Sequence, residues 1–183
     1  LGVAFGAGIL ATILRIVPHP PNFSGVGALG LFGGARLRTW QAYLLPLAIM
    51  MLSDFCLWLL TGLNELYSPL HMSRVFVYAS FMNYVVIGRF LIQGNSIRSV
   101  VIASTIGGVQ FYFFTNTCEW LFQPLMPMPD EFRYPRDFTG LVTCVAAGLP
   151  FFSQDLPYVD HPFMLFTDFR LSLLWLCAGD VIF

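Results

Sequence analysis

Long apolar segments alternate with short polar or proline-rich breaks along the 183-residue chain. A membrane-spanning helix needs about 20 mostly apolar residues, with a range of roughly 17–25. The apolar segments are residues 1–17, 23–35, 40–63, 73–92, 99–122, 138–152 and 162–183. Segment 23–35 is short and rich in glycine, and segment 138–152 is marginal in length. The pattern predicts an all-α, polytopic membrane helical bundle.

The placement of the arginines indicates how many segments cross the membrane. Loops on the cytoplasmic side carry an excess of arginine and lysine. If the N-terminus is cytoplasmic and 23–35 crosses, Arg36, Arg38, Arg89 and Arg98 all fall on the cytoplasmic side. The outer side then receives most acids: Glu65, Asp130, Glu131, Asp137, Asp155 and Asp160. With 138–152 as an outer half-helix, we expect about six transmembrane helices in one domain over residues 1–183.

Composition supports a membrane location. Hydrophobic residues make up 57% of the chain and charged residues 10%, whereas soluble domains carry about 25% charged residues. The first segment has no preceding basic run and no small-residue cleavage pattern, so we interpret it as a first membrane helix rather than a signal peptide. A net charge of -1 without a basic run excludes nucleic acid as the expected partner.

The sequence offers little support for catalysis or for a bound cofactor. The four cysteines are far apart in apolar segments without C-x-x-C spacing, which favours packing over a zinc or redox site. The three histidines lie at predicted membrane ends and do not form helical pairs that could ligate haem. Motifs of serine hydrolases, zinc proteases and phosphate-binding loops are missing. We therefore expect no enzyme, no cofactor and no metal site.

Asp54 is the most informative single residue, because it lies deep in the apolar segment 40–63. A charge at the centre of a bilayer costs about 2.5–3.5 kcal/mol on insertion scales, so such residues face the bundle interior and often mark a site. The structural alternative is a protonated Asp54 bonded to a neighbouring hydroxyl or amide group.

A polar stripe on segment 99–122 suggests further binding residues. Tyr112, Asn116 and Glu119 follow helical spacing, and Asn83 lies in the preceding segment. Together with Asp54 these residues are candidates for one ligand-binding pocket. The alternative is hydrogen bonding between helices, which contributes only about 0.6 kcal/mol per pair.

Two stripes of small residues suggest close contact between helices. The first is Ala4, Ala7, Gly8 and Ala11, whose spacing places them on one face of the first segment. Such a face can dock onto a partner membrane protein or pack within the same bundle. The second stripe is Gly27, Gly30 and Gly34. It indicates either tight packing or an irregular backbone lining a cavity.

Several motifs resemble the DUF6580 family of uncharacterised bacterial membrane proteins. The most specific is Arg15-Ile-Val-Pro-His-Pro-Pro-Asn22, which is followed by the glycine-rich stretch 25–35. Further matches are Leu52-Ser-Asp54, Thr115-Asn116, Tyr134-Pro-Arg136 and the stretch 146–152. The resemblance covers nearly the whole chain and implies a location in the bacterial cytoplasmic membrane.

That family is in turn similar to the substrate-capture S components of energy-coupling factor vitamin transporters. The shared features are a proline-rich loop after the first helix, a short second helix and a Leu-Pro-Phe-Phe stretch before the last helix. The resemblance implies capture of a small molecule from outside and docking on another integral membrane subunit through Ala7 and Ala11. It also implies that the loops 18–22 and 123–137 act as lids, which makes His19 and Asn22 candidate ligand contacts.

The sequence therefore leaves two functions open. The first is a small-molecule-binding subunit of a transport system, surrounded by membrane lipids and partner subunits. The second is a non-catalytic accessory subunit of a larger membrane complex, which the 19 phenylalanines and the small-residue face also suit. A membrane enzyme or proton channel built on Asp54 and Glu119 is weaker, because a single acid deep in the membrane makes a poor relay.

Overall fold

The computed structural model describes residues 2–16, 25–63, 68–126, 133–146 and 172–182. Within these ranges the chain is helical and contains no strand, which confirms the predicted all-α class. The helices are α1 (Gly2–Ile16), α2 (Val26–Arg36), α3 (Thr39–Leu60), α4 (Met72–Leu91), α5 (Ile97–Phe122), the short 3-10 helix η2 (Gln123–Leu125), α6 (Phe138–Ala146) and α7 (Ser172–Ile182).

The helices begin and end close to the predicted segment boundaries. Proline and glycine clusters end apolar runs because they interrupt the helical backbone pattern. Between α2 and α3, Leu37 and Arg38 are extended, and a new helix starts directly after them. The last residues of segment 138–152 and the first of segment 162–183 lie outside the described residues.

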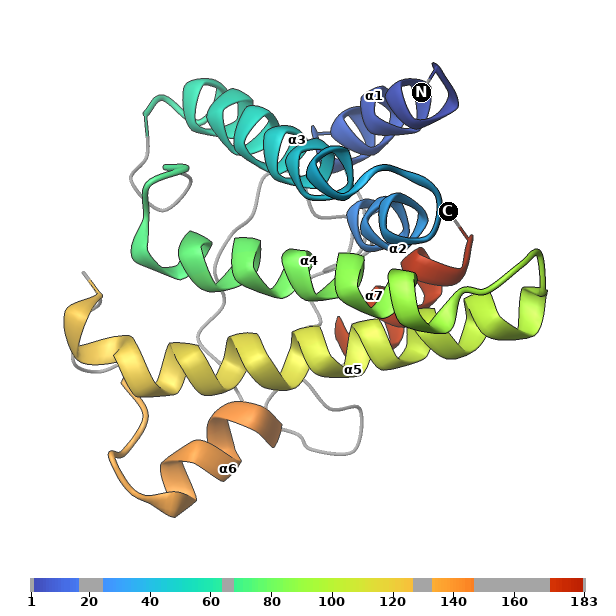
Figure 1. Cartoon of the computed structure of the whole chain (residues 1–183). Helices are drawn as coiled ribbons and strands as arrows, with labels where there is room; N and C mark the ends of the chain where they lie inside the picture. The colour runs from blue at the N-terminus through green and yellow to red at the C-terminus, as the bar shows by residue number, and fades with distance from the viewer. Residues whose placement is uncertain (1, 17–24, 64–67, 127–132, 147–171, 183) are drawn as a thin grey trace.

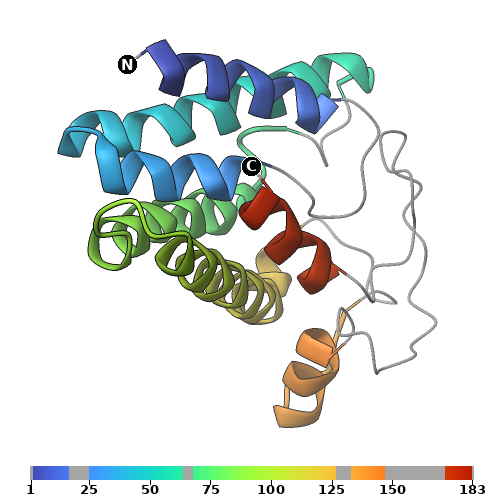
Figure 2. The same ribbon diagram turned by 90° about the vertical axis from the view of Figure 1, so that its right-hand side faces the viewer.

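The helices pack in layers, with α2 near the centre (Figure 1). It contacts α3 on one side and α4 on the other, and α5 packs against both α4 and α7. With 11 residues, α2 is about 16 Å long, whereas the 22 residues of α3 extend about 33 Å. Figure 2 shows that α2 starts inside the bundle, beside α7. Because α2 is half as long as α3, its N-terminus lies among other helices rather than at an end of the bundle.

Two helices of the described part are long and apolar enough to cross a membrane. They cover Thr39–Leu60 and Ile97–Leu125. The first contains the buried Pro46 without losing its helical course. The finding is consistent with a membrane protein, and the count of six crossings stays a prediction.

Glycines allow α2 and α4 to approach until their backbones touch. A Cβ atom on Gly34 would collide with the carbonyl oxygen of Val85. A Cβ atom on Gly88 would collide in the same way with the backbone of Leu31. Since α2 is a regular α-helix, the glycine stripe serves close packing rather than an irregular backbone.

One end of the bundle carries Arg36, Arg38, Arg89 and Arg98, whereas Arg15, Arg74 and Arg136 lie toward the opposite end. Arg36 donates to the carbonyl oxygen of Gly94 and, at 2.5 Å, to the side-chain oxygen of Asn95. Arg89 donates to Thr39 Oγ1 at 3.0 Å. The α2–α3 and α4–α5 turns therefore meet at the same end, on the right of Figure 1. We call this the arginine end.

Candidate functional site

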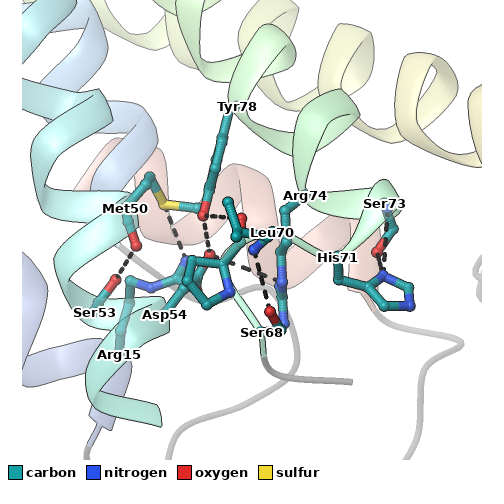
Figure 3. Close-up of polar contacts among 11 residues, drawn as sticks. Arg15, Met50, Ser53, Asp54, Ser68, Leu70, His71, Ser73, Arg74 and Tyr78 are labelled. Carbon is teal, nitrogen blue, oxygen red and sulfur yellow. Dashed lines mark hydrogen bonds and ion pairs between the residues drawn. The ribbon is translucent and has the colours of Figure 1, made fainter. Parts of the chain in front are cut away.

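A buried ion-pair cluster surrounds Asp54, near the end of the bundle opposite the arginine end. The Asp54 side chain is fully buried on α3. One carboxylate oxygen accepts a hydrogen bond from Arg15 of α1. The other accepts one from the Tyr78 hydroxyl at 2.8 Å and lies 3.8 Å from Nε of Arg74. Figure 3 shows these side chains converging on Asp54.

Helical periodicity explains why three helices meet at this point. On α4, Arg74 and Tyr78 are four residues apart and therefore face the same side. On α3, Met50 precedes Asp54 by one turn, and its sulfur lies 3.2 Å from Nη1 of Arg15. Arg15 occupies the last turn of α1, where a cation interacts favourably with the helix dipole.

The cluster balances positive and negative groups in an apolar setting. Glu119 of α5 also interacts electrostatically with Arg74. Removing one partner of a buried ion pair typically costs about 3–5 kcal/mol, because the other charge stays buried. The arrangement thus joins α1, α3 and α4 through charge, and it shows that Asp54 is ion-paired rather than bonded only to neutral groups.

Some buried hydrogen-bond donors near this cluster have no partner among the described residues. They include Nε of Arg15 and Nε1 of Trp58. Trp58 follows Asp54 by one helical turn on α3, so both side chains project from the same face. A buried polar group without a partner costs roughly 1–3 kcal/mol, and each exception calls for an explanation. Both groups can only donate, so what would satisfy them is a hydrogen-bond acceptor.

The other predicted ligand contacts on α4 and α5 are not gathered around Asp54. Asn83 is exposed and donates to Gln110 of α5 at 2.9 Å. Asn116 donates to the carbonyl oxygen of Tyr112 on its own helix. The Tyr112 hydroxyl donates to the carbonyl oxygen of Val145 and ties α6 to α5. Of the predicted ligand contacts that the structure describes, Asp54 belongs to the cluster and Glu119 interacts electrostatically with Arg74 of the cluster.

The predicted docking face on α1 is divided between two environments. Gly8 is buried against Leu45 and Ile49 of α3, and Ala11 belongs to the core. Ala7 is exposed. The side chain of Ala4 lies outside the described part, as do His19 and Asn22. At Gly8 and Ala11, the small side chains thus allow packing within the bundle. Docking of this face on a partner protein stays a prediction.

A polar anchor fixes the chain that leads into α6. The buried Gln123 side chain donates to the carbonyl oxygen of Tyr134 and accepts from its N–H group, at 2.8 and 2.9 Å. Arg136 donates to the last carbonyl groups of α5 and lies over the ring of Trp120. Burial raises the pKa of Tyr134 to about 12, so its hydroxyl stays protonated at neutral pH.

A second buried acid, Asp180 of α7, was not singled out by the sequence. It is 1% exposed, and its carboxylate accepts a hydrogen bond from the Tyr84 hydroxyl at 2.5 Å. Arg15 and Arg74 were also missed as partners of Asp54. An acid and two arginines within or beside apolar segments form a pattern that implies pairing, but the sequence alone does not tell which residues pair.

Comparison with protein families identifies the class of the chain. Residues 1–176 match the model of a family of unknown function, DUF6580. The chain therefore belongs to this family, as its motifs predict. No curated protein and no solved structure matches the chain. The more distant similarity to transporter S components stays a prediction.

Proposed function

We propose that the chain is an integral membrane subunit that binds a small molecule at the Asp54 cluster. The first support is the distribution of polarity. Large apolar side chains are exposed around the described helices, including Met51, Leu52, Phe55 and Leu59 on α3 and Ile102, Ile106 and Phe113 on α5. Charged and polar groups such as Asp54, Ser80, Ser104 and Asp180 are buried. Contiguous apolar surface of this kind suits contact with lipid.

The proposed orientation places the arginine end in the cytoplasm. Arginine-rich loops remain on that side during insertion. Both ends of the described chain, at Gly2 and Ile182, lie toward the arginine end in Figure 1, which suits an even number of crossings. Six crossings, with α6 as an outer half-helix, satisfy this arrangement. The Asp54 cluster then lies about 22 Å from Thr39, toward the outer surface.

Cysteine labelling in intact cells tests this orientation. Gln93 lies beside the α4–α5 turn at the arginine end, and Leu70 lies at the opposite end with 85% exposure. In a variant without native cysteines, we expect Leu70→Cys to react with a membrane-impermeant maleimide. Gln93→Cys should react only after the membrane is opened. The reverse pattern would overturn the orientation.

The class of ligand follows from the hydrogen-bond donors of the cluster that lack an acceptor. Nε of Arg15 and Nε1 of Trp58 both lack an acceptor among the described residues. A ligand that offers a carboxylate or another acceptor oxygen would satisfy both, and a charged acceptor would also gain from the guanidinium group. This is the observation that carries the proposal.

Purification with bound small molecules tests the binding function. We expect mass spectrometry of the gently purified protein to find one recurring small molecule with an acceptor group. Trp58→Phe, which removes the Nε1 donor and keeps an aromatic ring, should reduce its occupancy about tenfold, because a lost hydrogen bond to a charged group costs about 1.5–3 kcal/mol. Trp40→Phe, at a 63% exposed residue on the other end of α3, is the matched control. Equal occupancy in both variants would count against the site.

An accessory subunit of a larger membrane complex is the second candidate. It is favoured by the Asp54 carboxylate, whose two oxygens both have partners within the chain. An ion pair completed within the chain can serve the fold alone. The same purification separates the two functions, because an accessory subunit should arrive with a constant set of partner subunits and without a small molecule.

A further inference from the structure

Asp180 lies where four helices meet, at a depth different from that of Asp54. Its carboxylate accepts from the Tyr84 hydroxyl of α4, and its backbone carbonyl oxygen accepts from Ser104 of α5 at 2.9 Å. Ser104 is seven residues into α5, about 10 Å from the start of that helix at the arginine end. In a hydrocarbon core about 30 Å thick, this position is well inside the membrane.

Close packing around Asp180 leaves little space beside the carboxylate. A Cβ atom on Gly27, in the first turn of α2, would collide with Oδ1 of Asp180. Tyr84 and Ser104 are completely buried. Gly27 therefore allows α2 to begin directly against the acid, and the N–H group of Ala28 interacts with the carboxylate there. A helix N-terminus favours negative charge only weakly compared with a full cation.

No cation of the described part pairs with Asp180, in contrast to Asp54 with its two arginines. The titratable groups that face it are Tyr84 from α4 and Cys177 from its own helix. From α2 and α5 the neighbours are Gly27, Ala28 and Ser104, which do not titrate. Oδ1 has no hydrogen-bond partner in the described part. An ionised carboxylate in this setting would be a buried charge that the described residues stabilise with neutral donors, Tyr84 and the N–H group of Ala28, and without a cation. Folded proteins avoid a buried charge that is not paired.

We infer that Asp180 is a proton-binding site, and that the proton is held where α7 meets the start of α2. A metal ion would require several oxygen ligands around it, and the contact with Gly27 leaves no room for one at Oδ1. A proton needs no added space and removes the charge. Loss of the proton would place a bare carboxylate between α2, α4 and α7 and would loosen their contact. The inference does not depend on a small molecule bound at the Asp54 cluster.

Infrared spectroscopy of the full chain in lipid tests the inference directly. The difference spectrum between the wild type and Asp180→Asn at neutral pH should contain the C=O band of a protonated carboxyl group. Carboxylate bands in place of it would overturn the inference. Asp54→Asn is the matched comparison, and its difference spectrum should show carboxylate bands because Asp54 is paired with Arg15.

A second measurement separates proton binding from a purely structural role. Asn is always neutral, so the stability of Asp180→Asn should not vary with the titration of this residue. The wild type should lose stability relative to the variant as the pH rises above about 3.9, where the aspartate of the unfolded chain loses its proton, until Asp180 of the folded chain loses its own proton. If Asp180→Asn does not fold, a hydrophobic carbodiimide, which reacts with protonated carboxyl groups, replaces it. Mass spectrometry of the wild type should then find the label on Asp180 at neutral pH, and labelling of Asp54 alone would overturn the inference.

Discussion

Gly34→Ala is expected to destabilise the folded chain by about 1–3 kcal/mol, although alanine is the better helix former. The added Cβ would meet the carbonyl oxygen of Val85 and would lie 2.9 Å from the backbone nitrogen of Arg89. Both atoms belong to the backbone of α4, so neither can move away as a side chain can. The helices must separate, and overpacking of this kind typically costs 1–3 kcal/mol. The midpoint of thermal unfolding in detergent measures the effect.

The same substitution at Gly6 provides the control with the opposite sign. Gly6 is exposed on α1, and nothing lies within 4 Å of a Cβ atom placed there. Only helix propensity changes, so Gly6→Ala should stabilise the chain by up to about 1 kcal/mol. Gly88→Ala should behave like Gly34→Ala, because its Cβ would meet the backbone of Leu31. If Gly34→Ala and Gly6→Ala shift the midpoint equally, backbone contact between α2 and α4 does not limit stability.

The helices could be predicted because their signals are local. Apolar runs of sufficient length and the proline, glycine and arginine residues between them are visible without knowledge of the fold. The glycine stripe on α2 also indicated close packing, but the sequence did not show which helices would pack against it. Gly30 and Gly34 meet α4, whereas Gly27 meets Asp180 of α7. Which helix lies against a stripe depends on the arrangement of the bundle, which no single segment encodes.

The site was predicted only in part for the same reason. Asp54 stands out because the energetic cost of placing an acid in a membrane can be recognised from the apolar residues on either side of it in the sequence. Arg15 and Arg74, by contrast, lie near helix ends, where an arginine is ordinary. Their role appears only when the last turn of α1 and the first turn of α4 come together at α3. Asn83 was grouped with Asp54 on polarity alone, and the turn of α4 directs it instead toward Gln110.

The two buried acids divide the bundle into regions with different chemistry. Asp54 is matched by arginines and lies near the end of the bundle opposite the arginine end. Asp180 is matched by neutral donors and lies toward the arginine end, in contact with the half-length helix α2. α4 contributes a partner to each acid, since Arg74 lies beside Asp54 and Tyr84 donates to Asp180.

Asp54→Asn is expected to lower the free energy of unfolding by about 3–5 kcal/mol, an even larger effect than that of Gly34→Ala. The substitution keeps the shape of the side chain and removes its charge. Arg15 then loses its ion pair while its side chain remains only 13% exposed. The penalty arises from the buried guanidinium group rather than from the lost carboxylate. The unfolding midpoint and the yield of folded protein should both fall.

The double variant Arg15→Gln with Asp54→Asn shows whether the loss comes from the unpaired charge. It carries no isolated charge at that contact, so it should be more stable than Asp54→Asn alone. Arg98→Gln removes an exposed arginine at the other end and should change stability by less than about 0.5 kcal/mol. The single and double variants together form a cycle that isolates the coupling between the two side chains. Additive losses would mean that Arg15 and Asp54 act independently, and the cluster could then not hold α1 against α3 through charge.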